Sequence, residues 1–438
     1  MSNQPNRARP PNRAERVLAQ IEAAREEIVA FTAELIRVPT VNPPGEACRD
    51  CAELIGRRLR AAGLDVQYVE AEGLPEHTAE HPRVNVVGRG GGTGARKQIH
   101  LNGHFDVVPP GQGWTVDPFG GAVRDGRIYG RGASDMKSGI AAAIFAVESI
   151  RRASVDLEGA VDISGTVDEE SGGSAGVAHL CRTGLVSARN TDYAIIPEPF
   201  GPDRVCVGHR GVYWFDVVAR GRTAHGSMPH LGRSAIDDMG AVLEAFRTGL
   251  APELASRRSA LPVVPEASRR PSLNVNAVVG GQADEVVQSP CVADRCTATF
   301  DRRFIPEESF DDVKEEVERL VARVEAEDPG RDLTVVDRMV VHPVQAPPGS
   351  PLVTALSNAV RTVRGRDPAL VASPGTYDQK HFARIGGVRH CVAYGPGELS
   401  LAHQPDESCD VDDLVACTQV LALAVLELAG FGDDPVRG

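Results

Sequence analysis

Several features that define particular classes of protein are scarce in this chain of 438 residues. Runs of lysine or arginine never exceed a few residues and the formal net charge is −13, which argues against a surface for nucleic acid or anionic membrane. Residues 1–13 are rich in proline and arginine, lack the apolar stretch of a secretory signal, and predict a disordered tail. The apolar segment 414–431 is interrupted by Thr418, Gln419 and Glu427 and predicts a packed helix instead of a membrane span. Small-molecule chemistry becomes the leading class.

The nine cysteines form no recognisable framework. Cys48 and Cys51 make one Cys-x-x-Cys, but no second such pair or histidine pair lies at zinc-finger spacing, so a structural zinc is the less favoured interpretation. An odd number of scattered cysteines in a large chain predicts reduced thiols in a cytoplasmic protein.

Hydrophobic periodicity predicts an α/β fold with a sheet between layers of helices. Apolar residues at helical spacing predict helices over 15–37 and 52–62. Strands and helices then alternate up to residue 197, and the same rhythm returns after residue 342. Strands are expected at 65–70, 84–87, 98–102, 160–166 and 192–197, and helices at 139–151 and 176–183.

A different rhythm interrupts this pattern. The order strand, helix, strand, strand, helix, strand over residues 211–341 predicts a small ferredoxin-like α+β domain. This domain would be inserted into a larger three-layer domain of residues 14–210 and 342–438, with a mixed, mainly parallel sheet. Its segment 251–271, rich in Ala, Ser, Arg and Pro, is expected to be its least ordered part.

Two motifs resemble known sites but are better interpreted as loops. The segment GRGGGTG, residues 88–94, is followed by a predicted strand, whereas a phosphate loop needs a helix there, so we expect a hairpin turn. The segment HTAEH, residues 77–81, matches a metalloprotease pattern that requires a helix. Pro75 and Pro82 leave room for only a turn or two, so we expect a solvated loop.

Acids and histidines recur where predicted strands end. His104 and Asp106 lie two residues apart at a strand end, so one could bind a metal while the other orients it. Each such residue taken alone could be an ordinary solvated loop group. Taken together, the repeated strand-then-acid pattern favours a metal hydrolase, and the residues alone leave both interpretations open. The other candidates are Asp135, Glu169, Glu170, Glu198 and His403.

Seven motifs in a fixed order strengthen the hydrolase interpretation. They are GHFDVVP, YGRGASDMKSGIAA, DEESGG, IIPEP, TAHGSMPHLGRSAI, DRRFIP and AHQPDE. This set resembles the co-catalytic dinuclear metallo-deacylases and peptidases, which include acetylornithine deacetylase, succinyl-diaminopimelate desuccinylase, aminoacylase and glutamate carboxypeptidase. The resemblance covers nearly the whole chain after residues 1–13.

The resemblance implies a metal-dependent amidohydrolase that removes an N-acyl group from an amino acid or a related small carboxylic acid. The same site could serve a carboxypeptidase, a dipeptidase or a hydrolytic deaminase. An inactive scaffold protein would require a lost ligand, and none is lost.

The resemblance also implies a ligand set for two divalent metal ions. Asp135 would bridge the ions, His104 and Glu198 would complete one site, and Glu170 and His403 would complete the other. Zinc is the default, although cobalt and manganese also suit histidine and carboxylate ligands.

Two further residues receive roles in the chemistry. Glu169 would be the general base that moves a proton from a metal-bridging water to the leaving amine. Asp106 would hold the imidazole of His104.

The inserted domain resembles the lid and dimerisation domain of these enzymes. His225 matches the histidine that steadies the oxyanion in a neighbouring active site, with His230 as its rival. Arg303 and Asn274 match positions that bind the substrate carboxylate. Arg303 could instead form a surface ion pair, and its neighbour Arg302 stays an alternative.

Two segments depart from the pattern of the resembled enzymes. In GTYDQKHF, Gly375 and Thr376 match the substrate loop, but Tyr377 is inserted after them and could narrow the pocket or stack on an aromatic substrate. In HQPDE, Gln404 and Asp406 occupy variable positions. Both departures bear on the substrate and leave the expected metal ligands intact.

Overall fold

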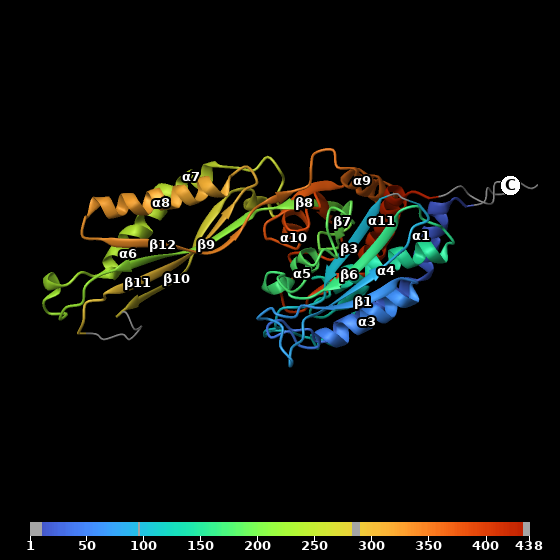
Figure 1. Cartoon of the computed structure of the whole chain (residues 1–438), viewed down its shortest axis with the longest axis horizontal. Helices are drawn as coiled ribbons and strands as arrows, with labels where there is room; N and C mark the ends of the chain where they lie inside the picture. Colours follow the sequence, from blue (N-terminus) through green and yellow to red (C-terminus); the bar gives the residue numbers. More distant parts are fainter. Residues whose placement is uncertain (1–10, 95–96, 283–289, 432–438) are drawn as a thin grey trace, which may run out of the picture. The chain divides into compact units, whose positions relative to one another are not determined.

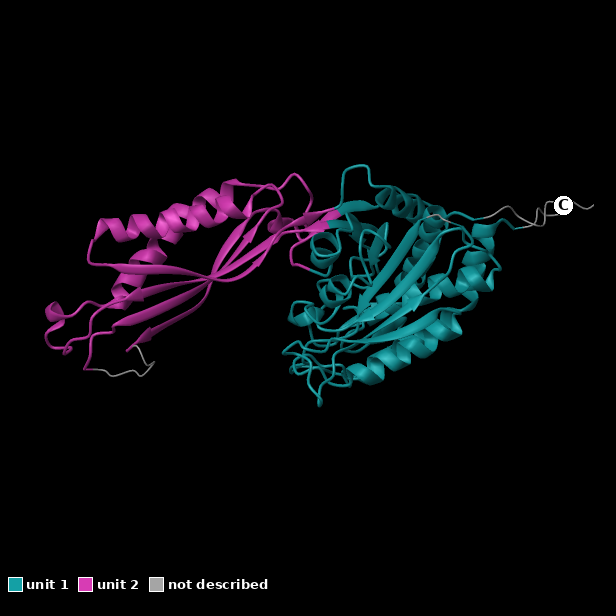
Figure 2. Cartoon of the chain, viewed as in Figure 1, with its two compact units in different colours: residues 1–207, 346–370, 377–438 teal, residues 208–345, 371–376 magenta. Residues whose placement is uncertain are grey.

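A computed structural model describes residues 11–94, 97–282 and 290–431 of the chain. Contacts divide the chain into two compact units, coloured separately in Figure 2. Unit 1 comprises Met1–Val207, Ala346–Leu370 and Tyr377–Gly438, and unit 2 comprises Gly208–Gln345 and Val371–Thr376. Unit 2 is therefore inserted between the two major stretches of unit 1.

The larger sheet forms the centre of unit 1 and is mixed and nine-stranded, with the order β1-β2-β6-β3-β7-β15-β8-β13 and β14 beside β8; β13 and the last residues of β8 and β14 belong to unit 2. The four central strands β6, β3, β7 and β15 run parallel, and the outer pairs are antiparallel. The bounds are β1 (Asp65–Glu70), β2 (Val84–Arg89), β3 (Gln98–His104), β6 (Ala160–Thr166), β7 (Tyr193–Ile196), β8 (Arg204–His209), β13 (Val344–Gln345), β14 (Ala369–Ser373) and β15 (His390–Ala393).

Helices cover both faces of this sheet. On β3, a side chain at Gly103 would collide with Ile140 of α4, whereas His100 lies 5.8 Å from the ring of Phe382 in α10. Residues 100 and 103 are an odd number of positions apart, so their side chains point to opposite faces of the sheet. The helices α4 and α10 therefore lie on opposite faces, and the expected layered α/β architecture is confirmed. The helix α3 packs along β1 and β2 (Figure 1). The bounds are α1 (Arg13–Ala23), α2 (Arg25–Arg37), α3 (Cys48–Ala61), α4 (Lys137–Arg152), α5 (Val177–Arg182), α9 (Pro351–Arg364), α10 (Gln379–Arg384) and α11 (Val411–Ala429).

A separate three-stranded sheet pairs the segment 408–410 with the segment 122–129. Strand β5 (Arg127–Tyr129) pairs with β4 (Ala122–Arg124) on one side and with β16 (Ser408–Asp410) on the other. The loops that follow β5 and precede β16 are therefore held side by side although they are far apart in sequence.

Three local expectations need correction or restriction. The expected hairpin at residues 88–94 is wrong, because β6 lies between β2 and β3 and the segment crosses the start of β6, where Thr93 donates to the Leu157 carbonyl. The predicted helix over 15–37 is two helices separated at Ala24. Residues 1–10 of the predicted tail lie outside the described residues, and Asn12 already forms a capping box at the start of α1.

Unit 2 is a four-stranded antiparallel sheet in the order β10-β11-β9-β12 with helices on one face. Its core is strongly aromatic: Phe215 stacks on Phe300 at 4.9 Å and on Tyr213 at 4.8 Å. Segment 251–271, expected to be poorly ordered, contains a helix and a helical turn. The bounds are β9 (Gly211–Arg220), α6 (Ala235–Ala245), α7 (Ala251–Ser256), β10 (Ser272–Gly281), β11 (Arg295–Phe304), α8 (Phe310–Glu327) and β12 (Asp332–Val341).

None of the helices in the described part of the chain combines the length and the apolar character needed to cross a membrane. The final helix α11, predicted from residues 414–431, is instead a packed helix of unit 1 whose side chains are mostly buried.

Candidate dinuclear metal centre

Three neighbouring parallel strands end at one edge of the unit 1 sheet. His104 ends β3 and pairs in register with Thr166, the last residue of β6. The 3-10 turn Glu169–Ser171 follows β6, and Glu198 follows β7. Because the carboxyl ends of parallel strands lie at the same edge, their polar side chains are brought together.

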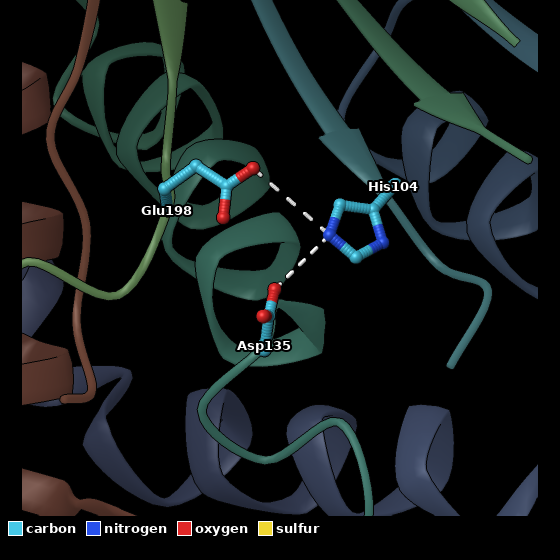
Figure 3. A group of neighbouring side chains, drawn as sticks. All are labelled: His104, Asp135 and Glu198. Carbon is cyan, nitrogen blue, oxygen red and sulfur yellow. Dashed lines mark hydrogen bonds and ion pairs between the residues drawn. The ribbon is translucent and has the colours of Figure 1, made fainter. Parts of the chain in front are cut away.

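His104, Asp135 and Glu198 form the first cluster, shown in Figure 3. The Nε2 atom of His104 lies 3.0 Å from Asp135 Oδ1 and 4.0 Å from Glu198 Oε1. All three side chains are nearly inaccessible, and their possible ligand atoms lie within 4.8 Å of one another. One nitrogen and two carboxylates, all of them ligand-type groups, thus converge on one point.

The second cluster shares Asp135 with the first and adds Glu170 and His403. His403 Nε2 lies 3.1 Å from Glu170 Oε2 and 3.7 Å from Asp135 Oδ2. The two oxygens of Asp135 thus lie near different histidines, an arrangement that would suit a carboxylate shared by two metal ions.

The charges of the site fit divalent cations. Burial raises the pKa of Glu198 well above its ordinary value and that of Glu170 to about 7. Burial would also raise the pKa of Asp135, but contact with His104 holds it low. The hydrogen bond with Glu170 raises the pKa of His403 to about 9. A bound cation would stabilise the ionised form of these buried carboxylates, which the histidines alone do not fully compensate. The residues therefore fit metal ions.

Asp106 orients more than the imidazole it was predicted to hold. His104 Nδ1 lies 3.1 Å from the Asp106 carbonyl and 3.5 Å from its Oδ1, which favours a proton on Nδ1 and leaves Nε2 free as a ligand. The same carboxylate accepts the backbone N–H groups of Glu169 and Glu170, both at 3.2 Å. Asn42 holds the carboxylate in turn at 2.9 Å. One buried aspartate therefore positions two predicted ligands and the predicted base.

Glu169 lies next to the clusters without joining them. Its side chain is 12 % exposed, and its Oε1 lies 3.4 Å from Lys380 Nζ, a lysine that sequence reasoning missed. Asp378 is buried nearby, and burial, followed by the charge of Glu169, raises the pKa of Asp378 to about 7. Both residues lie in the segment GTYDQKHF, directly after Tyr377.

A glycine sets the distance between α4 and the end of β7. A side chain at Gly139 would lie 2.0 Å from the carbonyl oxygen of Pro197, the residue before Glu198. The first turn of α4, which follows Asp135, can therefore approach the Glu198 segment only because residue 139 has no Cβ.

The remaining predicted site residues lie in unit 2. His225 is exposed, and its Nδ1 lies 2.7 Å from Ser227 Oγ. Asn274 is exposed on β10 and donates to Asn276. Gly375 and Thr376 lie in the short stretch that contacts place in unit 2.

The two neighbouring arginines of β11 point to opposite faces of the unit 2 sheet. Arg302 is fully buried and pairs with Glu308 at 2.7 Å. Arg303 is partly exposed and pairs with Asp301, also at 2.7 Å. Of the two, only Arg303 lies where a substrate group could reach it.

Tyr377 and Asp406 have structural partners. Tyr377 is buried, and its hydroxyl donates to Gln379 Oε1 at 2.8 Å, so it is not presented for stacking on a substrate. The Asp406 carboxylate accepts the N–H and the hydroxyl of Thr115, both at 2.8 Å.

The fold and the two clusters sharing one carboxylate define a class of metal-dependent hydrolases, and comparison with known proteins gives the family. Residues 100–427 match the model described as peptidase family M20/M25/M40, so the chain belongs to this family. The expected metal-dependent hydrolase acting on C–N bonds is confirmed, as is the suspected family.

Curated relatives match along most of the chain. A succinyl-diaminopimelate desuccinylase of Cereibacter sphaeroides is 30 % identical over 393 residues, covering 87 % of this chain and 94 % of that protein. The N-formyl-4-amino-5-aminomethyl-2-methylpyrimidine deformylase of Bacillus subtilis is 29 % identical over 432 residues, covering 92 % and 94 %.

Solved structures share the fold. Human carnosine dipeptidase 1 superposes with a TM-score of 0.73 at 22 % identity and covers 96 % of this chain and 100 % of that chain. An M20 family metallo-carboxypeptidase from Sulfolobus solfataricus gives a TM-score of 0.70 at 20 % identity, with coverages of 92 % and 99 %.

Proposed function

We propose that the protein hydrolyses the amide bond of an N-acylated amino acid or a related small carboxylic acid, using two metal ions. The observation that carries this proposal is the pair of clusters that share Asp135, with Glu169 beside them. His104 and Glu198 would hold one ion, Glu170 and His403 the other. Zinc is the first candidate, with cobalt and manganese as alternatives.

The protein's own residues supply proton transfer and orientation. Metal ions bound at this site would lower the pKa of a water molecule and polarise the amide carbonyl. Glu169 would accept a proton from the attacking water and return it to the nitrogen of the leaving amine. Lys380 holds the Glu169 carboxylate at 3.4 Å, and Asp106 fixes its backbone, so the base is oriented before substrate binds.

The relatives that match in sequence favour an N-acyl compound over a peptide as the substrate. The desuccinylase and the deformylase, as their names state, remove short acyl groups from amines, and both align over most of this chain. The dipeptidase and carboxypeptidase are similar in fold at lower identity, which is support for the fold alone.

The test is a panel of small amides. N-acetyl, N-succinyl and N-formyl amino acids and a set of dipeptides would be incubated with metal-free protein and with protein loaded with Zn²⁺, Co²⁺ or Mn²⁺. We expect metal-dependent release of the amine from at least one N-acyl substrate. Metal-dependent cleavage of dipeptides alone would replace the deacylase proposal by a dipeptidase, and no metal-dependent hydrolysis would favour a scaffold role.

Unit 2 is proposed as a lid and as the site of homodimer formation. Strand β10 has a strand partner on one side only among the described residues, and Val275, Val278 and Val279 on it are 40–56 % exposed. Ile236 of α6 is 48 % exposed and lies beside Gly280. An exposed apolar edge strand is a ready surface for pairing with a second copy.

In such a dimer His225 would steady the oxyanion in the partner's site, and Arg303 and Asn274 would bind the substrate carboxylate, with Gly375 and Thr376 in the substrate loop. Sedimentation of the wild-type protein and of Val279→Lys would test the dimer. We expect the variant to shift toward monomer; a wild-type protein that is monomeric at micromolar concentration contradicts the proposal.

A further inference from the structure

A buried ion pair joins the two loops that carry Asp135 and His403. Arg131 and Glu407 are 2 % and 0 % exposed, and Arg131 Nη1 lies 2.6 Å from Glu407 Oε2. Arg131 precedes Asp135 by four residues and Glu407 follows His403 by four. Each partner thus belongs to a different loop of the metal centre.

Glu407 reaches across to the Asp135 loop. Its Oε1 accepts the backbone N–H of Ser134 at 2.9 Å and that of Asp135 at 3.0 Å. Its backbone carbonyl also accepts the N–H of Gly130 at 2.9 Å. Both carboxylate oxygens are therefore used, one on the arginine and one on the backbone at the bridging aspartate.

Arg131 reaches in the opposite direction, to the His403 loop. Its guanidinium donates to the carbonyl oxygens of His403 at 3.2 Å and Gln404 at 3.3 Å. It also donates to Pro110 at 3.1 Å and lies 5.2 Å from the ring centroid of Trp114. The contacts are reciprocal, since each charged side chain holds the main chain of the other's loop.

We propose that Arg131 and Glu407 are positioning residues that fix the distance between Asp135 and His403, and so set the affinity for the ion held by Asp135, Glu170 and His403. The inference rests on the proposed metal centre. Neither Arg131 nor Glu407 is a member of the two ligand clusters.

The geometry of the loops explains why such a device is needed. His403 has a left-handed backbone with φ 64°, and neither it nor Asp135 lies in a helix or strand. Loops of this kind do not hold ligand atoms in place by regular hydrogen bonding. A buried ion pair is a costly way to gain stability, but it fixes one relative position of its two loops.

Cobalt titration of the metal-free protein would test the proposal, because the visible spectrum of Co²⁺ reports the geometry of each bound ion. For Glu407→Gln and Arg131→Met we expect the ion at Asp135, Glu170 and His403 to bind about 10–100-fold more weakly. The ion at His104 and Glu198 should change less in Arg131→Met, because Arg131 holds the His403 loop. Arg131→Lys should recover part of the loss.

A double variant sharpens the result. If the two residues act as a unit, Arg131→Met combined with Glu407→Gln should bind cobalt about as weakly as the worse single variant, and not as weakly as the product of the two effects. Independent, multiplying effects would overturn the proposal that the pair acts as one device.

The matched control breaks a similar ion pair in unit 2. Arg302 and Glu308 are also 2.7 Å apart with the arginine fully buried, so Glu308→Gln should lower thermal stability without changing cobalt affinity or spectrum. Thermal unfolding of all metal-free variants identifies any that do not fold, in which case Arg131→Lys carries the test.

The outcomes separate this inference from the proposed function. Wild-type affinity and spectrum in both Glu407→Gln and Arg131→Met would overturn the inference, as would weaker cobalt binding in the Glu308→Gln control. A wild-type protein that binds two ions but cleaves no amide would contradict the proposed substrate and leave the positioning role standing. A wild-type protein that binds no metal would overturn both.

Discussion

The sheet edge of unit 1 and the core of unit 2 bury different kinds of side chain. At the sheet edge of unit 1, His104, Asp106 and Glu198 are buried together with the pair Arg131 and Glu407. The centre of unit 2 is instead a cluster of aromatic and aliphatic side chains around stacked phenylalanines. The architecture contributes to this difference, because parallel strands of unit 1 end at one edge of their sheet, whereas the sheet of unit 2 is antiparallel.

The comparison shows which part of the chain contains side chains that serve the proposed site at a cost in folding free energy. Aromatic burial stabilises a domain directly, whereas buried charges cost free energy unless each is paired and hydrogen-bonded. Unit 1 tolerates its charges because most of them contact one another or backbone groups. The buried charged groups at this sheet edge are thus an argument for the site that is independent of the family relationship.

The largest effect is expected from Glu169→Gln. This substitution removes the proposed general base but none of the proposed metal ligands. We expect turnover to fall by about 10²–10⁴-fold, with two ions still bound and stability nearly unchanged. Turnover on the amide found in the panel and metal content per chain are the measurements. Normal turnover in this variant would rule out Glu169 as the base.

Truncating the aromatic core should affect unit 2 alone. Phe300→Ala is expected to destabilise unit 2 by about 3–5 kcal/mol while cobalt binding in unit 1 stays unchanged. The two tryptophans provide reporters, because Trp114 lies in unit 1 and Trp214 in unit 2. In a Trp114→Phe background, denaturant unfolding followed by fluorescence reports unit 2; an unaltered transition would contradict the aromatic-core interpretation.

A buried histidine should make the stability of unit 1 depend on pH. Burial, with a smaller contribution from Arg89, lowers the pKa of His100 to about 3. In the unfolded chain His100 has its ordinary pKa and binds a proton below about pH 6.5, whereas in the folded chain it stays neutral down to about pH 3. The free energy of unfolding is therefore highest above about pH 6.5 and decreases as the pH falls toward 3.

The matched measurement compares wild type with His100→Gln, which can keep the hydrogen bond to Ser164. Below pH 6.5 the wild type should lose up to about 1.4 kcal/mol per pH unit more than the variant. Denaturant unfolding of metal-free protein at pH 7, 6 and 5 gives the slopes, with exposed His230→Gln as control. Parallel slopes would show that His100 is not buried as a neutral group.

The smallest effect is expected at a helix terminus of unit 2. Ser309 caps α8 by accepting the backbone N–H of Asp312, so Ser309→Ala should cost about 1 kcal/mol. Ser309→Asp keeps a capping oxygen, so its stability should stay within a few tenths of a kcal/mol of the wild-type value. Equal losses in both variants, measured with the Trp214 reporter, would contradict the capping role.

The layered fold and the candidate ligands could be predicted because both leave local patterns, whereas the grouping of the ligands around two ions was implied by the resemblance to known enzymes. A strand followed by an acid is visible in the sequence at Glu170 and Glu198, and parallel strands bring such residues to one edge. The structure places all five expected ligands in two clusters around Asp135.

The rest depended on contacts that no local pattern records. The hairpin expected at residues 88–94 failed because β6, from a later part of the chain, lies between the two strands. Glu407 was visible in AHQPDE and Arg131 in YGRGASDMKSG, but their pairing spans 276 residues. Lys380 was missed for the same reason, since its partner Glu169 is 211 residues away.

The close approach at Gly139 has a consequence for how this protein can evolve. Any larger residue there would meet the Pro197 carbonyl and push apart the segments that bear Asp135 and Glu198. A larger residue at position 139 is therefore tolerated only if the backbone at Pro197 moves as well.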